Sequence, residues 1–116
     1  MSSHQESRVY QINHVKLFSY FHDALTTLGG QIDYSVLNTG DIGAFFGGCL
    51  PGFNLEAHVH IEPQSKNETV VTMKCKVGRG AFIDWGKSKP LAEKIFACVD
   101  YIIQRKEVGE SIKPAK

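Results

Sequence analysis

The amino-acid sequence predicts a single α+β domain in which an antiparallel sheet of about five strands carries two helices on one face. The chain has 116 residues, which is the usual size of one domain. Several segments alternate apolar and polar residues, as half-buried strands do, and two others repeat apolar residues every three or four positions, as amphipathic helices do. The predicted order is β-α-β-β-β-β-α. Packing both helices on one face of the sheet would bury all of these apolar sides.

The first strand and helix are predicted at the N-terminal end of the chain. Arg8 to Ile12 reads as a short strand, and Asn13 is a suitable N-cap for the helix that follows. Gly29 provides the C-terminal stop of that helix. Its apolar face is formed by Leu17, Phe18, Phe21, Ala24, Leu25 and Leu28.

A hairpin is predicted over residues 31–46. Asn38-Thr39-Gly40 suits a three-residue loop with glycine in the left-handed conformation. This loop would place Val36 opposite Ile42 and Tyr34 opposite Ala44. The residues expected on the inner face are therefore Ile32, Tyr34, Val36, Ile42, Ala44 and Phe46.

A second hairpin and a second helix complete the predicted domain. The hairpin turns at residues 63–67, and its inward side chains are Leu55, Ala57, Val59 and Ile61, then Val71, Met73, Cys75 and Val77. Ser88, followed by Pro90, caps a helix that ends near Arg105. We expect a flexible N-terminus at 1–7, one domain at 8–105 and a flexible tail at 106–116.

Charge and composition exclude several classes of partner. Thirteen Lys and Arg against twelve Asp and Glu give a net charge of +1, so nucleic acid is not an expected partner. No apolar stretch reaches the length of a membrane span. The three cysteines are far apart and lack C-x-x-C spacing, which indicates reduced thiols. We therefore expect a cytoplasmic protein.

His58 and His60 are the candidates for a metal site. Both lie on one strand face with Glu56, and such a group binds metal only when a further ligand converges. Lys74 and Lys76 on the neighbouring strand oppose a cation, and Glu56 is expected to pair with Lys74. We expect a solvated strand face, no bound metal and no cofactor. The other titratable residues form no recognisable catalytic set, which favours a non-enzymatic role.

The most informative stretch is the glycine-rich and aromatic segment 43–53. In the predicted register, Phe45 projects from the outer face between Gly43 and Gly47, with Leu50 and Phe53 on the loop that follows. These three residues, with Trp85, are the candidates for an interface or ligand contact. The alternative is that the second helix or a curl of the sheet covers Phe45.

The order of elements and several segments resemble small bacterial α+β domains of unknown function related to the helix-grip fold. The likeness covers residues 8–105 and is carried by the Val9-to-Leu28 opening, the Gly40-Asp41-Ile42 turn, the 55–61 and 70–77 strands and Asp84-x-Gly86-x-Ser88. This resemblance implies a fold and no particular reaction. In some helix-grip proteins an apolar ligand lies between the sheet and the long helix.

Two functions remain open from the sequence. The first is a non-catalytic binding or protein-interaction module, forming a homo-oligomer through Phe45 and the loop at 47–53. The second is a protein that binds a small apolar ligand, or a minor enzyme, with a cavity between the sheet and the C-terminal helix.

Overall fold

The computed structural model describes residues 3–47, 55–77 and 88–108. Its elements are β1 (Ser3–Tyr10), α1 (His14–Thr27), β2 (Gln31–Val36), β3 (Asp41–Phe46), β4 (Leu55–Ser65), β5 (Glu68–Val77) and α2 (Ser88–Ile103), followed by a π-helical turn, η1 (Gln104–Val108). Within the described ranges, no helix is long and apolar enough to cross a lipid bilayer.

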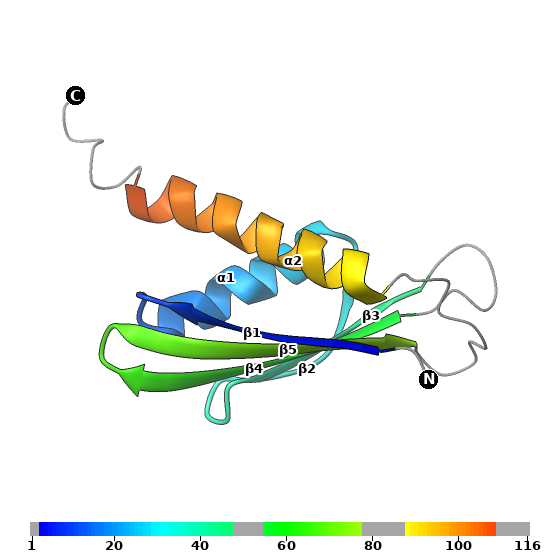
Figure 1. The fold of residues 1–116 in the computed structure, drawn as a ribbon, viewed down its shortest axis with the longest axis horizontal. Helices are drawn as coiled ribbons and strands as arrows, with labels where there is room; N and C mark the ends of the chain where they lie inside the picture. Colours follow the sequence, from blue (N-terminus) through cyan, green and yellow to red (C-terminus); the bar gives the residue numbers. More distant parts are fainter. Residues whose placement is uncertain (1–2, 48–54, 78–87, 109–116) are drawn as a thin grey trace.

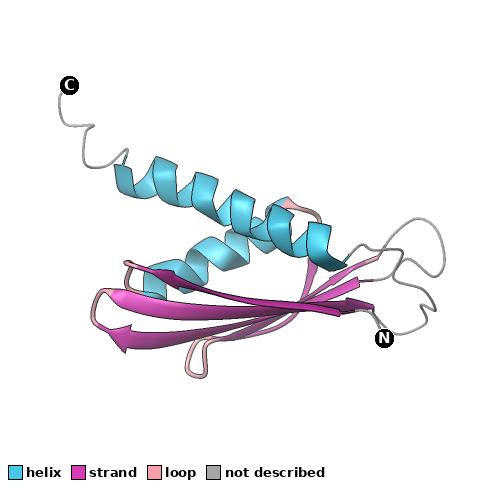
Figure 2. Ribbon diagram, in the orientation of Figure 1, coloured by secondary structure: helices cyan, strands magenta, loops and turns pink. Residues whose placement is uncertain are grey.

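The strands form one antiparallel sheet in the order β1-β5-β4-β3-β2. Figure 1 shows both helices on the same side of this sheet, and Figure 2 shows the two resulting layers. The predicted fold class and element order are confirmed. The sheet therefore has one face covered by the helices, called the helix face below, and one outer face.

The core lies between the helix face and the two helices. The buried apolar residues come from α1, β3, β4, β5 and α2, and include Leu17, Phe21, Leu25, Ile42, Val59, Met73, Ile95, Phe96 and Val99. Asn13 caps α1 as predicted, because its side-chain oxygen accepts a 2.9 Å hydrogen bond from the Val15 amide. Gly29 follows the helix with a φ of 95°, a conformation that favours glycine.

The predicted register of the β2–β3 hairpin is wrong. A bulge lies between Ile32 and Tyr34, so Tyr34 pairs with Gly43, and Val36 pairs with Asp41. The connection is the four-residue turn 37–40, which is one residue longer than predicted. The bulge moves Tyr34 and Val36 to the outer face, where they are 40% and 42% exposed.

Gly40 retains its predicted left-handed conformation, with a φ of 78°. Its carbonyl accepts a 2.8 Å hydrogen bond from the Ile61 amide, and a Cβ atom at this position would overlap the Ile61 carbonyl oxygen. The turn therefore needs glycine for space as well as for conformation.

Other boundaries and pairs also differ from the sequence prediction. The first strand spans Ser3–Tyr10, whereas the pattern predicted Arg8–Ile12. The second hairpin turns at residues 66–67. Glu56 lies opposite Lys76 rather than Lys74, because the turn is tighter and the register shifts between Pro63 and Ser65.

Candidate functional site

The helix face of β1 carries a row of polar side chains. In an antiparallel pair, directly opposite residues share a face of the sheet. The β5 partners of this row are Cys75, Met73, Val71 and Thr69, all of which are buried. The side chains directed toward the helices from β1 are therefore His4, Glu6, Arg8 and Tyr10, which we call the β1 polar row.

Three members of the β1 polar row form a continuous hydrogen-bonded chain. The Glu6 carboxylate lies 3.1 Å from His4 Nε2 and accepts a 2.9 Å hydrogen bond from Arg8 Nε. These hydrogen bonds, from His4 first and then Arg8, lower the pKa of Glu6. Arg8 Nη1 lies 3.7 Å from Asp100 of α2, and its guanidinium carbon lies 4.0 Å from the centre of the Phe96 ring. Arg8 thus connects the edge strand to α2.

Tyr10 ends the β1 polar row and differs from the other members. Its ring packs edge-on against Phe21, with 6.1 Å between the ring centres. Its hydroxyl is enclosed and donates no hydrogen bond to any described residue. Burial raises the pKa of Tyr10 well above its usual value, the nearby Asp100 charge adds to the shift, and Arg8 partly offsets it. The phenol is therefore a protonated donor at neutral pH, and it lacks an acceptor.

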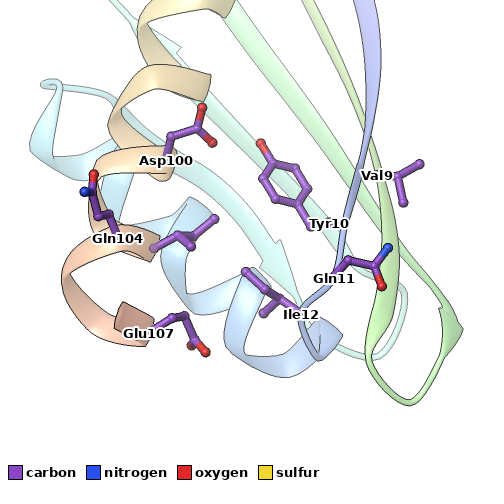
Figure 3. A pocket seen from close by; sticks show the side chains of 8 residues that line it. Val9, Tyr10, Gln11, Ile12, Asp100, Gln104 and Glu107 are labelled. Carbon is purple, nitrogen blue, oxygen red and sulfur yellow. The ribbon is translucent and has the colours of Figure 1, made fainter. Parts of the chain in front are cut away.

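A groove opens beside Tyr10, between the end of β1 and the C-terminal part of α2 with η1 (Figure 3). Its volume is about 510 Å³. The lining combines apolar side chains with carboxylates and amides. We call it the β1–α2 groove, and its residues are Val9, Tyr10, Gln11, Ile12, Asp100, Ile103, Gln104 and Glu107.

Hydrogen bonds from neighbouring elements hold both walls of the groove. The buried Thr69 hydroxyl donates to the Ile12 carbonyl at 2.7 Å, which fixes the chain where it leaves β1. On the other wall, Glu107 accepts a 2.5 Å hydrogen bond from the Tyr20 hydroxyl and lies 3.5 Å from Lys16 Nζ. These contacts tie η1 to α1, so β5 and α1 support the two walls of the groove.

The interface candidates from the sequence lie away from this groove. Phe45 is half-buried in β3 and belongs to the outer face, since it pairs with Glu56 and lies between the core residues Ala44 and Phe46 in the chain. Leu50, Phe53 and Trp85 lie outside the described residues.

His58 and His60 also belong to the outer face, and they enter separate hydrogen-bond networks. His58 Nδ1 lies 2.7 Å from the Tyr34 hydroxyl, and its Nε2 lies 3.0 Å from Glu56. His60 Nδ1 lies 2.7 Å from Asp41, and this hydrogen bond raises the pKa of His60 and lowers that of Asp41. Across residues 3–47, 55–77 and 88–108, no group of three or more potential ligands is arranged to hold a metal ion.

The sequence prediction missed the β1 polar row because it treated residues 1–7 as lying outside the domain. A usable signal was present, since polar and aromatic residues recur with a period of two from His4 to Tyr10. No sequence pattern indicated that α2 would continue into η1, which supplies one wall of the groove.

No family model and no curated protein matches the sequence. Solved structures share the fold. The di-domain ARO/CYC BexL from the BE-7585A biosynthetic pathway has a TM-score of 0.64 at 10% identity, over 90% of this chain and 47% of that chain. The protein XoxI from Bacillus cereus has a TM-score of 0.61 at 8% identity, over 90% and 94%. Ara h 8.0201 has a TM-score of 0.58 at 9% identity, over 90% and 99%.

These comparisons establish a fold and no activity, because identities near 10% do not carry function. The chain spans about half the length of BexL and nearly the full length of the other two proteins. The predicted helix-grip-like fold is confirmed.

Proposed function

We propose that this chain is a non-catalytic binding protein for a small, largely apolar molecule held in the β1–α2 groove. The observation that carries the proposal is the enclosed Tyr10 hydroxyl, which has no partner among the described residues and adjoins the groove. A buried polar group without a partner is rare in proteins and is costly, so a ligand atom that binds it restores a lost interaction.

The shape and lining of the groove support the same proposal. Its volume of about 510 Å³ lies within the range of small-molecule sites. Ile12 and Ile103 offer an apolar surface, while amides and carboxylates provide a few polar contacts. The groove also lies between the sheet and the C-terminal helix, where some helix-grip proteins hold an apolar ligand.

The proposal is tested by filling the groove. We expect 2-acetylnaphthalene, added to ¹⁵N-labelled protein, to shift the backbone amide resonances of Gln11 and Gln104. Ile103→Trp should abolish these shifts by occupying the groove. Val36→Trp, on the outer face, is the matched control and should retain them. Absent shifts in the wild type, or shifts that persist in Ile103→Trp, would contradict the proposal.

A second candidate is self-association through the outer face of β2 and β3. Tyr34, Val36 and Leu37 are 40%, 42% and 45% exposed, and they lie on or beside the hairpin that carries Phe45. Exposed apolar groups gathered in one region mark contact surfaces in many proteins. Leu50, Phe53 and Trp85 remain proposed members of this interface, and a cytoplasmic location remains a prediction.

Sedimentation velocity over a wide concentration range tests this second candidate. We expect a concentration-dependent oligomer that Phe45→Lys weakens, because the new cation faces Glu56 and disrupts the apolar surface. Tyr101→Lys, at an exposed position of α2, should have no effect on the oligomer. A wild-type protein that stays monomeric throughout would eliminate self-association.

A further inference from the structure

We infer that the ligand of the β1–α2 groove is an uncharged molecule with a carbonyl oxygen that accepts a hydrogen bond from Tyr10, and that organic anions such as fatty acids are excluded. This inference rests on the proposed function and specifies its chemistry. It combines three observations: the Tyr10 hydroxyl lacks an acceptor, carboxylates line the groove, and the apolar side chains of Ile12 and Ile103 line it as well.

The Tyr10 hydroxyl determines the polar group of the ligand. A phenol that remains protonated donates one hydrogen bond, and this one has no acceptor among the described residues. A carbonyl oxygen on a ligand supplies that acceptor without bringing a charge into the core. A hydrocarbon of the same shape would leave the donor unpaired.

Access to the hydroxyl depends on Asp100. The Asp100 side chain is 55% exposed, and its carboxylate lies 3.7 Å from Arg8 Nη1. Figure 3 shows Asp100 on α2 facing Tyr10 across the upper end of the groove. Side-chain rotamers commonly change when a ligand binds. A rotation of Asp100 toward solvent would open the hydroxyl to a ligand oxygen.

The charges around the groove argue against an anionic ligand. Asp100 and Glu107 contribute two carboxylates to the lining, and the remaining polar lining residues outside Tyr10 are Gln11 and Gln104. Two cations next to the groove are already engaged, since Arg8 binds Glu6 and Lys16 lies beside Glu107. An anion would lie beside two carboxylates in a lining that contains no cation. A cationic ligand would have to displace Arg8 or Lys16 from these carboxylates, so an uncharged ligand is favoured.

The apolar side chains accommodate the rest of the molecule. Ile12 and Ile103 are partly buried against the core. A flat hydrocarbon body placed on these side chains removes apolar surface from water. The ligand therefore lies with its carbonyl toward Tyr10 and its apolar part across the groove.

Three probes that share one ring system test the inference by fluorescence titration. They are 2-acetylnaphthalene, 2-ethylnaphthalene and 2-naphthoate, which carry a carbonyl, a methylene and a carboxylate at the same position. We expect the ketone to bind about 3- to 10-fold more tightly than the hydrocarbon, which is the usual net effect of one hydrogen bond. The carboxylate should bind more weakly than either.

Tyr10→Phe is the decisive variant, because it removes the hydroxyl and keeps the ring. It should bind the ketone and the hydrocarbon equally, and its thermal unfolding midpoint should equal or exceed that of the wild type. Asp100→Asn should raise 2-naphthoate affinity by about 3-fold, the size of one solvent-screened charge effect. This variant keeps the side-chain shape and removes its charge.

The outcomes separate the inference from the proposed function. Equal binding of ketone and hydrocarbon by the wild type would overturn the inference while leaving the groove as a ligand site. Tightest binding of 2-naphthoate would overturn it as well. A ketone preference that persists in Tyr10→Phe would show that another group provides the hydrogen bond. Failure of all three probes to bind would overturn the proposed function together with the inference.

Discussion

The helix face of the sheet has two regions that lie under the same helices and differ in chemistry. In β3, β4 and β5, this face is apolar and closed, with Ile42, Val59 and Met73 fully or almost fully buried. In β1, the same face presents a row of charged and hydroxyl groups beside an open groove. The central strands thus stabilise the fold, and the edge strand carries the candidate site.

The edge position of β1 explains why it tolerates polar groups. Among the described strands, only β5 pairs with it, and α2 covers it from one side. Charged side chains that point inward from an edge strand also discourage pairing with the edge of another molecule. The opposite edge strand, β2, is interrupted by a bulge, which is another common protection.

Aromatic rings connect the closed region to the polar one. Phe21 lies edge-on to both Tyr10 and Phe96, with ring centres 6.1 Å and 6.0 Å apart. The Arg8 guanidinium packs over the Phe96 ring. A change at Phe21 should therefore affect both regions, whereas a change in the β1 polar row should remain local.

The largest effect is expected for Phe21→Ala. Phe21 is fully buried, so its truncation leaves a cavity between α1, α2 and the sheet. This cavity should lower the free energy of unfolding by about 3–5 kcal/mol. Urea denaturation followed by circular dichroism measures this loss. Tyr101→Ala, at a position that is 58% exposed, is the control and should cost less than about 1 kcal/mol. Similar losses in the two variants would show that the core is not closed around Phe21.

An intermediate effect is expected when the β1 polar row is made apolar. In Glu6→Leu/Arg8→Leu, the free energy of unfolding should change by less than about 1 kcal/mol, since the ion pair is partly exposed and contributes little. The double variant should aggregate more readily, because β1 then lacks inward charges. Denaturation curves and light scattering measure the two effects separately. A large loss of stability would show that the row is part of the structural core.

The fold was predictable from sequence because its patterns are strong and local. The alternation in β4 and β5 and the apolar stripe of α1 identified most core residues, and Asn13 and Gly29 marked the ends of that helix. The β2–β3 register was not predictable in the same way. A bulge adds one residue to a strand and reverses the faces beyond it, and the pattern Ile32-x-Tyr34-x-Val36 does not reveal where that occurs.

The candidate site was harder to predict than the fold. The groove needs the end of β1, the last turns of α2 and η1 to meet, and these segments are about 90 positions apart in the chain. The sequence emphasised Phe45, His58 and His60, which all belong to the outer face. The sequence shows which residues alternate, whereas the packing of α2 decides which face of β1 is covered.

The smallest effect is expected for the pH dependence of stability at Glu6. Its pKa in the folded protein lies below the ordinary value of 4.5, because His4 and Arg8 bind the ionised form. The stabilisation is therefore complete above pH 4.5 and is lost as the pH falls through the folded pKa. Glu6→Gln removes this contribution. The stability difference between wild type and Glu6→Gln should stay constant from neutral pH to about pH 5 and shrink at lower pH.

Asp41→Asn on the outer face sharpens this comparison, because the partner of Asp41 is itself titratable. The pKa of Asp41 is lowered and that of His60 is raised, so their pairing stabilises the fold only where both are charged. Its contribution falls on the acid side as Asp41 protonates, and on the alkaline side as the pH rises through the folded pKa of His60. Arg8, a partner of Glu6, keeps its charge from pH 2 to 9. Urea titrations from pH 2 to 9 should therefore give a two-sided profile for Asp41→Asn and an acid-limited one for Glu6→Gln; an alkaline limb in the Glu6→Gln profile would contradict this prediction.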